Sequence, residues 1–290
     1  MEKVGFIGLG IMGRPMALHL LKAGYAVSIL EKSKASKELV AAGARSYPTP
    51  AAIAQDCEVV ITMLPDSPEV VGIVTGQEGI LEGIRQGSLF IDMSTIAPSM
   101  AKSLYEQLQK KGVAALDAPV SGGQAGAEAA TLSIMAGGAE PAFQRALPLF
   151  QAMGKNIVHI GGPGAGQMTK ACNQMIVGIT IQAVAEAFTL AKKAGVDLEK
   201  MRTALLGGFA QSRILDLHGK RIIERNFSPG FKIKLHRKDM NIALEAGKEF
   251  SVPLYGTAQV AAHMDALLAQ GKGEFDHSAI ALLMEQLSNI

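Results

Sequence analysis

The sequence predicts an α/β domain with a mostly parallel sheet, followed by an all-α domain, and three observations support this fold class. An apolar strand pattern near the amino end runs directly into a glycine-rich turn and a helical pattern. Strand and helix patterns then alternate as far as Ile160, and only helical patterns follow. Because such alternation builds parallel sheets covered by helices, we place the sheet domain in residues 1–162 and the helical domain in residues 163–290.

The first predicted strand is followed by the spacing G-x-G-x-x-G. A buried strand, this turn, a helix and a second strand succeed one another within residues 3–30. Gly8 would allow the tight turn, Gly10 the approach of a pyrophosphate to the backbone, and Gly13 close packing of the helix on the strand. The pattern predicts a Rossmann-type dinucleotide-binding domain, in which the turn residues that bind the cofactor are Gly8, Gly10, Ile11, Met12 and Gly13.

An acidic residue stands at the carboxyl end of the second predicted strand. Glu31 follows Gly13 by 18 residues. A carboxylate at that place can accept hydrogen bonds from both ribose hydroxyls and would repel a 2′-phosphate, which favours NAD (NADH) as the cofactor. The cations and the hydroxyl of Lys32, Ser33 and Lys34 could instead host a phosphate, so NADP stays open.

Later strand patterns end in turns that carry further candidate cofactor contacts. Ligands of parallel α/β sheets gather outside the carboxyl ends of the strands. Leu64 and Pro65 end one strand pattern, and Thr95 follows the next. We predict cofactor contacts from these three residues, with ordinary turn chemistry as the alternative. The expected strands beyond the first two are residues 58–64, 88–92, 113–117, 132–137 and 156–160.

A second run of small residues follows the strand pattern that ends at Asp117. Ser121, Gly122 and Gly123 form its centre. Consecutive small residues can aim several backbone N–H groups at one point, which suits a carboxylate or a phosphate, and the serine hydroxyl adds a donor. We therefore predict an anion site for substrate here, with a flexible loop as the alternative.

A third glycine-rich stretch, residues 161–166, precedes a long apolar helical pattern that runs to about Lys193. Lys170, Asn173 and Gln174 are three and four residues apart, so they share one helix face within the first two turns. Beyond them the helix is apolar on almost every side, which is typical of a buried helix. We expect an amine on a polar face at the start of a buried helix, and a solvated lysine is the alternative.

The remaining sequence contains only helical patterns separated by glycine, serine and proline. Its densest basic run, residues 231–239, begins a helix, so Lys238 could be carried back to a ligand site rather than lie on a solvated face. The expected helices are residues 197–206, 212–224, 235–250, 253–269 and 277–289.

Composition and motif spacing argue against several classes of function. A net charge of +2 favours neither nucleic-acid binding nor a membrane-surface role. Cys57 and Cys172 have no partner at metal or redox spacing, and the six histidines form no HxxxH or HExxH pair, so no metal site is predicted. The most apolar window, residues 175–191, contains Gln182 and Glu186 and is too short to span a bilayer. The amino end has no signal-peptide pattern, and we expect a cytoplasmic protein.

Taken together, these segments resemble the β-hydroxyacid dehydrogenase family, which includes the 3-hydroxyisobutyrate dehydrogenases. The likeness extends from end to end, and four motifs in order carry it. They are residues 5–13 at the cofactor turn, 117–123 at the small-residue turn, 164–174 at the long helix, and Lys238-Asp239-Met240 late in the chain.

The resemblance implies an oxidoreductase in which a nicotinamide cofactor supplies hydride to a small semialdehyde that bears a carboxylate. Lys170 would be the catalytic lysine, and Thr95 and Lys238 would contact cofactor or substrate. It also implies a homo-oligomer, a dimer or a tetramer. Members that use NADP often have Asn-Arg-Thr where this chain has Glu31-Lys32-Ser33, and many have a second asparagine at the place of Gln174. The residues that would hold substrate are Ser121, Gly122, Gly123, Asn173 and Gln174.

Within the family the likeness is greatest to the branch that reduces tartronate semialdehyde. The segments that carry it are residues 61–65, 225–227, 229–231 and 276–279. Oxidation of 3-hydroxyisobutyrate, or action on another short β-hydroxyacid, is the alternative. A non-catalytic dinucleotide-binding module is a further alternative, but such a module would be expected to lose the amine of Lys170.

Overall fold

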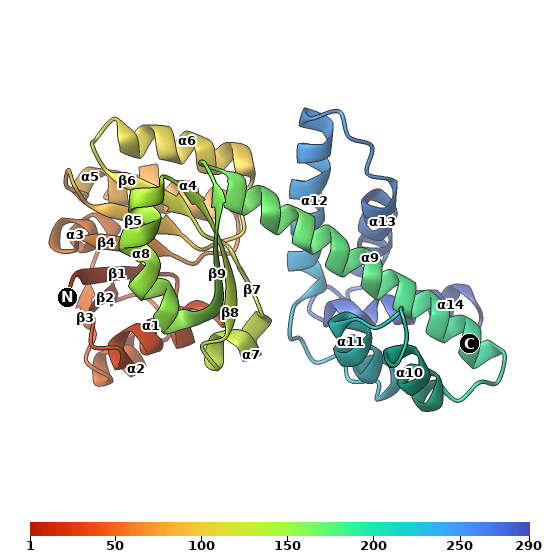
Figure 1. Ribbon diagram of the computed structural model, residues 1–290. Helices are drawn as coiled ribbons and strands as arrows, with labels where there is room; N and C mark the ends of the chain where they lie inside the picture. Colours follow the sequence, from red (N-terminus) through yellow and green to blue (C-terminus); the bar gives the residue numbers. More distant parts are fainter. The chain divides into compact units, whose positions relative to one another are not determined.

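The computed structural model describes all 290 residues, which form two compact units (Figure 1). Unit 1 is Met1–Lys170 and contains every strand, and unit 2 is Ala171–Ile290 and contains helices only. Helix α9 (Ala165–Lys193) begins in unit 1 and continues into unit 2. The expected fold class, a sheet domain followed by a helical one, is confirmed.

A single nine-stranded sheet runs through unit 1. Its strand order is β3-β2-β1-β4-β5-β6-β8-β7, and β9 pairs with β8. Strands β1 to β6 run parallel to one another, whereas β8 runs antiparallel to β6 and β7. The direction in which the chain adds strands reverses between β1 and β4, which is where such sheets bind ligands. The strands are β1 Lys3–Ile7, β2 Ala26–Leu30, β3 Arg45–Tyr47, β4 Val59–Thr62, β5 Leu89–Asp92, β6 Ala114–Asp117, β7 Val120–Ser121, β8 Leu132–Gly138 and β9 Gly154–Gly161.

Helices cover both faces of this sheet. Successive strand residues point to opposite faces, and both faces are apolar here, so each is buried under helices. On β4, Val59 and Ile61 belong to the core that contains α1, whereas Val60 belongs to the core that contains α3, α4 and α6. In Figure 1, α1 and α2 lie at the bottom of the sheet unit and α6 at its top. The helices of unit 1 are α1 Gly13–Lys22, α2 Ser36–Ala41, α3 Pro50–Asp56, α4 Ser67–Thr75, α5 Ile80–Gly83, α6 Pro98–Gln109, α7 Gly123–Glu128 and α8 Glu140–Met153.

Two strands were not expected from the sequence. Strand β3 has three residues and β7 has two, so neither is long enough to show an alternating pattern. The run of small residues at 121–123 is more ordered than a loop, since Ser121 ends β7 and Gly123 begins α7.

Unit 2 packs its helices around one apolar core. Ile181 and Phe188 of α9 meet Met264 of α13 and Ile280 of α14 there. All five helices expected in this half are present, and the last one begins as a 3₁₀ turn. Besides α9, the elements are α10 Leu198–Leu206, α11 Arg213–Ile223, α12 Ile233–Glu249, α13 Tyr255–Ala269, η1 His277–Ala279 and α14 Ile280–Leu287.

Helix α9 has 29 residues and ends at Lys193, where the helical pattern of the sequence predicts its end. By length and composition alone it could cross a membrane, but half of its most apolar stretch is buried within the structure. Because Ile181, Ala185 and Phe188 belong to the core of unit 2, α9 has the character of a core helix.

Candidate functional site

The glycine turn after β1 has the geometry that its spacing predicts. Gly8 has φ +106°, a conformation that favours glycine, and a Cβ on it would overlap the carbonyl of Met63 just beyond β4. A Cβ on Gly13 would overlap the carbonyl of Gly8 and lie 3.0 Å from the ring of Phe6. The turn therefore closes against the end of β4, and α1 packs directly on β1.

The amino end of α1 is open to an anion. The helix has no side-chain cap and no acidic residue in its first turn, and its first backbone bond runs from Arg14 N to Gly10 O at 3.0 Å. A Cβ on Gly10 would meet nothing within 4 Å, and the neighbouring Ile11 is exposed. Met12 stands at the N-cap position. First-turn N–H groups and the helix dipole thus face free space, which suits a pyrophosphate.

Glu31 directly follows β2 and is exposed, and its N–H donates to the carbonyl of Tyr47 at 3.0 Å. Because β1 and β2 are parallel, the ends of both strands lie at one edge of the sheet. Glu31 therefore shares that edge with the glycine turn. Lys32 and Lys34 are also exposed, so the structure keeps the carboxylate and the cations at the same corner.

The loops after β4 and β5 are tied together by hydrogen bonds. Leu64 N donates to Ser94 Oγ at 2.8 Å, and Ser94 N donates to Oδ1 of the buried Asp92 at 3.1 Å. These bonds bring the two loops side by side at the edge where the glycine turn lies. The predicted cofactor contacts on these loops are Leu64, Pro65 and Thr95.

The turn between β7 and α7 depends on two glycines. Gly122 has φ +138° and Gly123 has φ +60°, and side chains are strained at both angles. A Cβ on Gly123 would meet nothing within 4 Å, so the backbone there is approachable. Ser121 is half-buried and pairs with Ser133 of β8.

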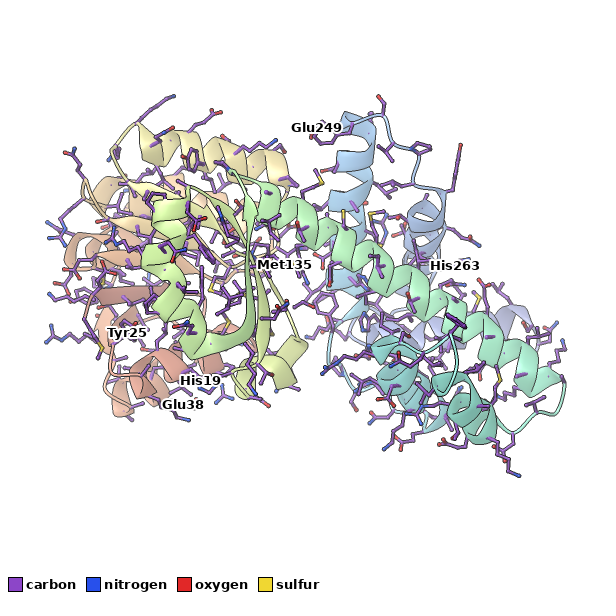
Figure 2. The ribbon with its side chains drawn as sticks, in the orientation of Figure 1. His19, Tyr25, Glu38, Met135, Glu249 and His263 are labelled. Atoms are coloured by element: carbon purple, nitrogen blue, oxygen red, sulfur yellow. The ribbon has the colours of Figure 1, made fainter.

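The first turn of α9 rests on the sheet without intervening side chains. A Cβ on Gly166 would lie 2.5 Å from the carbonyl oxygen of Asp117 and would overlap the carbonyl of Met135, which is labelled in Figure 2. A Cβ on Gly137 of β8 would lie 2.7 Å from Gly166 N. The glycines around the start of α9 therefore permit backbone-to-backbone packing on β6 and β8.

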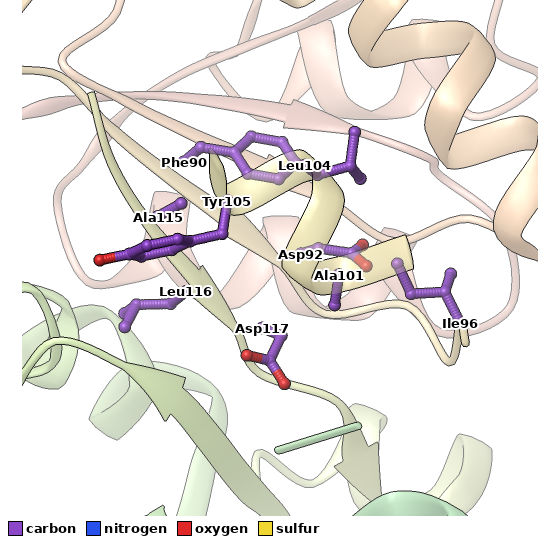
Figure 3. A pocket seen from close by; sticks show the side chains of 9 residues that line it. All are labelled: Phe90, Asp92, Ile96, Ala101, Leu104, Tyr105, Ala115, Leu116 and Asp117. Atoms are coloured by element: carbon purple, nitrogen blue, oxygen red, sulfur yellow. The ribbon is translucent and has the colours of Figure 1, made fainter. Parts of the chain in front are cut away.

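Asp117, the last residue of β6, caps this helix. Its Oδ1 accepts from Gly164 N and its Oδ2 from Gln167 N, both at 2.8 Å. Burial raises the pKa of Asp117 to about 6, although these hydrogen bonds oppose the shift. Figure 3 shows Asp117 and Asp92 on neighbouring strands, where they line a cavity of about 10 Å³. That volume holds one water at most.

Gln167 ties α9 to the loop that carries Thr95. Its Oε1 accepts from Ile96 N at 3.1 Å and its Nε2 donates to Ser94 O at 2.7 Å, so it bonds on both sides of Thr95. Lys170 lies one helical turn later and only 6% of it is exposed. The structure thus fixes Lys170 relative to the carboxyl edge of the sheet, which is inconsistent with a freely solvated lysine.

In unit 2 the structure brings four polar residues of α9 and α12 into one hydrogen-bonded chain, which we call the amide–carboxylate chain. Asn173 Nδ2 donates to Gln174 Oε1 at 2.7 Å. Gln174 Nε2 donates to Asp239 Oδ2 at 2.5 Å, and Lys238 Nζ lies 3.0 Å from Asp239 Oδ1. Three of the predicted site residues, 65 positions apart at most, are therefore neighbours.

Three residues that support the site are not among the site residues predicted from the sequence. Asp117 and Gln167 fix the start of α9, and Asp239 joins Lys238 to Gln174. A signal was available for two of them. Asp117 ends a strand pattern, and Gln167 precedes Lys170 by one turn of helix, so both could have been placed beside the lysine.

Family comparisons cover nearly the whole chain in two parts. Residues 3–161 match the NAD binding domain of 6-phosphogluconate dehydrogenase. Residues 164–284 match the domain described as NAD-binding of NADP-dependent 3-hydroxyisobutyrate dehydrogenase.

Individual relatives match nearly the full length of the chain. A 2-hydroxy-3-oxopropionate reductase of Escherichia coli (strain K12) is 44% identical over 99% of this chain and 98% of its own length. A 3-hydroxyisobutyrate dehydrogenase of Pseudomonas aeruginosa is 38% identical over 95% of each chain. Among solved structures, Mycobacterium tuberculosis 3-hydroxyisobutyrate dehydrogenase with L-serine has a TM-score of 0.91 and 32% identity, and the match covers 98% of this chain and 99% of that one.

Proposed function

Because the chain belongs to the 3-hydroxyisobutyrate dehydrogenase-like family of NAD(P)-dependent β-hydroxyacid dehydrogenases, we propose that it reduces tartronate semialdehyde to glycerate, with Lys170 as the general acid. The substrate is supported by the higher identity to the E. coli 2-hydroxy-3-oxopropionate reductase, 44% against 38% for the P. aeruginosa 3-hydroxyisobutyrate dehydrogenase. Oxidation of 3-hydroxyisobutyrate is the second candidate, supported by that relative and by the M. tuberculosis structure.

The residues of unit 1 fit a nicotinamide dinucleotide. The open amino end of α1 suits the pyrophosphate, and Glu31 at the end of β2 suits the ribose hydroxyls. Such a cofactor supplies hydride to the aldehyde carbon when bound. We favour NADH, since an exposed carboxylate at Glu31 repels a 2′-phosphate.

The protein's own groups would act on the substrate's charges. Lys170 stabilises the negative charge that develops on the carbonyl oxygen and donates a proton to it. The backbone N–H groups around Gly122 and Gly123 bind the substrate carboxylate, which fixes the aldehyde for reaction. The remaining proposed contacts are Ser121, Asn173 and Gln174 to substrate, and Thr95 and Lys238 to cofactor or substrate.

One observation carries this assignment. Lys170 is buried one helical turn after Gln167, whose side chain bonds the backbone on both sides of Thr95. Cofactors of such sheets bind outside the carboxyl ends of the strands, so an amine fixed at that edge can act as general acid on a substrate beside the cofactor.

The direct test replaces Lys170 by alanine. We expect kcat to fall by about 100- to 10,000-fold, the usual contribution of a positioned general acid, while the Kd for NADH stays within about threefold. Steady-state kinetics and fluorescence titration of NADH measure the two quantities. Lys193→Ala, at the far end of the same helix, is the matched control and should keep both values. Near-normal kcat in Lys170→Ala would overturn the assignment.

The substrate is tested by comparing kcat/KM for tartronate semialdehyde with that for its methyl-bearing counterpart. We expect the hydroxyl-bearing aldehyde to be preferred by at least about tenfold, since a site that bonds a hydroxyl strongly rejects an analogue without it. The reverse preference would favour the 3-hydroxyisobutyrate reaction.

We further propose that the enzyme is a cytoplasmic homo-oligomer. Exposed apolar side chains along α9 support association, because Ile176 is 65% and Leu190 73% exposed. Sedimentation of the purified protein tests this, and a monomer at micromolar concentration would contradict it.

A further inference from the structure

Three histidine rings form a hydrogen-bonded row inside unit 2. Nε2 of His236, on α12, lies 3.0 Å from the carbonyl oxygen of Gln174 on α9. Nδ1 of His236 lies 2.9 Å from Nδ1 of His277 in η1, and Nε2 of His277 lies 3.3 Å from Nε2 of His218 on α11. His236 and His277 are buried, and the His218 side chain is 18% exposed. We call His218, His277 and His236 the histidine row.

The row ends beside a carboxylate that is already held in place. Oδ1 of Asp276 accepts from the N–H and hydroxyl of Ser278, and Oδ2 accepts from the N–H groups of Gly230 and Phe231. Nδ1 of His218 lies 3.7 Å from Oδ1. Four donors outside the histidine row thus hold Asp276 in place.

The contacts of the row dictate where its protons are. A carbonyl oxygen can only accept, so Nε2 of His236 carries a hydrogen. Burial lowers the pKa of His277 well below its usual value, so that ring is neutral at pH 7. The two facing Nδ1 atoms share one hydrogen, and we assign it to Nδ1 of His277, because a neutral His236 with its hydrogen on Nε2 presents a lone pair at Nδ1. His277 then accepts at Nε2 from Nε2–H of His218, so each contact holds one proton.

Gly178 of α9 makes room for this arrangement. A Cβ on Gly178 would lie 3.3 Å from Cε1 and 3.4 Å from Nε2 of His236. Glycine is unfavourable inside a helix, and here its missing side chain lets the His236 ring reach the Gln174 carbonyl one turn earlier. Helices α9 and α12 therefore meet at a close, specific contact.

We propose that His236, ordered by the rest of the histidine row, is a positioning residue that sets the register of α12 against α9 for the amide–carboxylate chain. Asp239 follows His236 by three residues, so both lie on one face of α12. While His236 bonds the backbone of Gln174, Asp239 meets the side chain of the same residue, and Lys238 is held beside it. The proposal rests on the proposed function only for the roles of Gln174 and Lys238; the proton order is independent of it.

A metal ion is a weaker explanation of the same cluster. Ligand atoms of His218, Asp276 and His277 lie within 4.8 Å of one another. However, Asp276 already accepts four hydrogen bonds, and Nε of Arg221 lies 3.5 Å from its Oδ1, so a cation would be repelled. Both ring nitrogens of His277 are also engaged. The metal content of the protein is therefore one outcome of the test.

The first test reads the proton order directly by ¹⁵N NMR of the histidine rings in the full-length protein, with resonances assigned from single His→Gln variants. At pH 7 we expect His277 to be neutral with its hydrogen on Nδ1, and His236 and His218 each to have a hydrogen on Nε2. A coupling across the hydrogen bond should connect Nδ1 of His277 with Nδ1 of His236. A cationic His277, a hydrogen on its Nε2, or stoichiometric zinc by elemental analysis would overturn the proposal.

The second test reads positioning by kinetics. His236→Leu should raise KM for the semialdehyde by about tenfold, the effect of losing one buried hydrogen bond, with kcat changed less than about threefold. His236→Gln keeps an N–H near the place of Nε2 and should restore most of the KM. The control is His263→Leu, which should leave KM unchanged. His263 is a partly buried histidine on α13 that bonds to Gln182. Figure 2 labels this residue.

Failure of the two proposals can be told apart. Turnover of none of the semialdehydes by the wild-type protein would overturn the proposed function, while the NMR test of the row would still stand. An unchanged KM in His236→Leu, alongside normal wild-type turnover, would overturn positioning alone. If His236→Leu does not fold, His277→Gln with His236 intact provides the same KM comparison.

Discussion

At position 166 a single methyl group decides whether α9 can rest on the sheet. Its Cβ would lie 2.5 Å from the backbone oxygen of Asp117 and would overlap that of Met135, and neither neighbour is a flexible side chain. Gly162, four residues earlier, offers a contrast, because a Cβ there would meet nothing within 4 Å. Of these two glycines in the same stretch, only Gly166 is needed for the close packing of α9 on the sheet.

Gly166→Ala should displace the first turn of α9 and destabilise unit 1 by about 1–3 kcal/mol, the usual penalty of overpacking. Because Lys170 follows by one turn, kcat should fall by about 100-fold, as small displacements of reacting groups often cause. Urea unfolding and steady-state kinetics measure the two effects. Gly162→Ala is the matched control and should change neither. Equal behaviour of the two variants would mean that the close packing at Gly166 does not position the lysine.

Cofactor preference also depends on a single residue in this structure. Glu31 is exposed beside Lys32 and Lys34. Its negative charge repels a 2′-phosphate, whereas the two lysines attract one. Glu31→Gln should raise kcat/KM for NADPH by about tenfold or more and lower it for NADH, since the ribose hydroxyls lose a charged acceptor. Glu106→Gln, the same change at an exposed position of α6, is the control for a general effect of surface charge. A wild-type preference for NADPH would contradict the proposal that Glu31 selects NADH.

At the scale of elements, the carboxyl group of Asp117 joins β6 to α9, and its shifted pKa makes this connection depend on pH. Its pKa is about 6 in the folded protein and 3.8 when unperturbed, so the folded state binds more protons between these values. Stability from this group is therefore greatest below pH 3.8 and falls by up to about 3 kcal/mol as pH rises through 6. An isosteric amide removes this titration.

We expect the difference in unfolding free energy between wild type and Asp117→Asn to shift by up to about 3 kcal/mol in favour of wild type as pH falls from 6.5 to 4. Hydrogen exchange of backbone amides in β6 and the first turn of α9 measures it locally. Thr95→Ser, which lacks a titrating group, is a control for general effects at this edge. A constant difference across this range would contradict the raised pKa.

The elements differ in how far the sequence predicts them. The long strands and helices are predictable from the sequence because their apolar spacing is set by burial on one face or two. Strands β3 and β7 are not predictable in this way, since two or three residues show no period. The cofactor turn was recognisable because strand, glycines and helix are contiguous. The amide–carboxylate chain joins residues of α9 and α12 that only tertiary packing brings together, so only its individual members could be proposed.

At the scale of the whole molecule, the two units differ in their response to acid. In unit 1 the shifts of the acidic groups oppose one another, because burial raises the pKa of Asp117 while Lys3 and Tyr47 lower that of Asp56. In unit 2 every resolved shift is downward. The groups concerned are Glu274, Asp276, His277 and Glu285.

The signs of these shifts predict which unit unfolds first in acid. A histidine with a lowered pKa stabilises the folded state above pH 6.5 and loses that contribution as pH falls, because the unfolded chain takes up the proton first. Groups facing His277 that set this balance are His236 of α12, His218 and Arg221 of α11, and Asp276 beside it. The paired carboxylates lose their contributions in turn once pH falls below their unperturbed values, 4.5 for Glu285 and 3.8 for Asp276.

We therefore expect acidification from pH 7 to 4 to lower the stability of unit 2 more than that of unit 1. Hydrogen exchange read by mass spectrometry can follow peptides from β4 and from α13 in the same sample, with exchange rates corrected for pH. Protection should fall first in α13, beginning near pH 6.5, and His277→Gln should delay the loss by removing the first titrating group. Simultaneous loss in both peptides, unchanged in that variant, would mean that the units unfold as one and that the buried histidine does not control the acid limit.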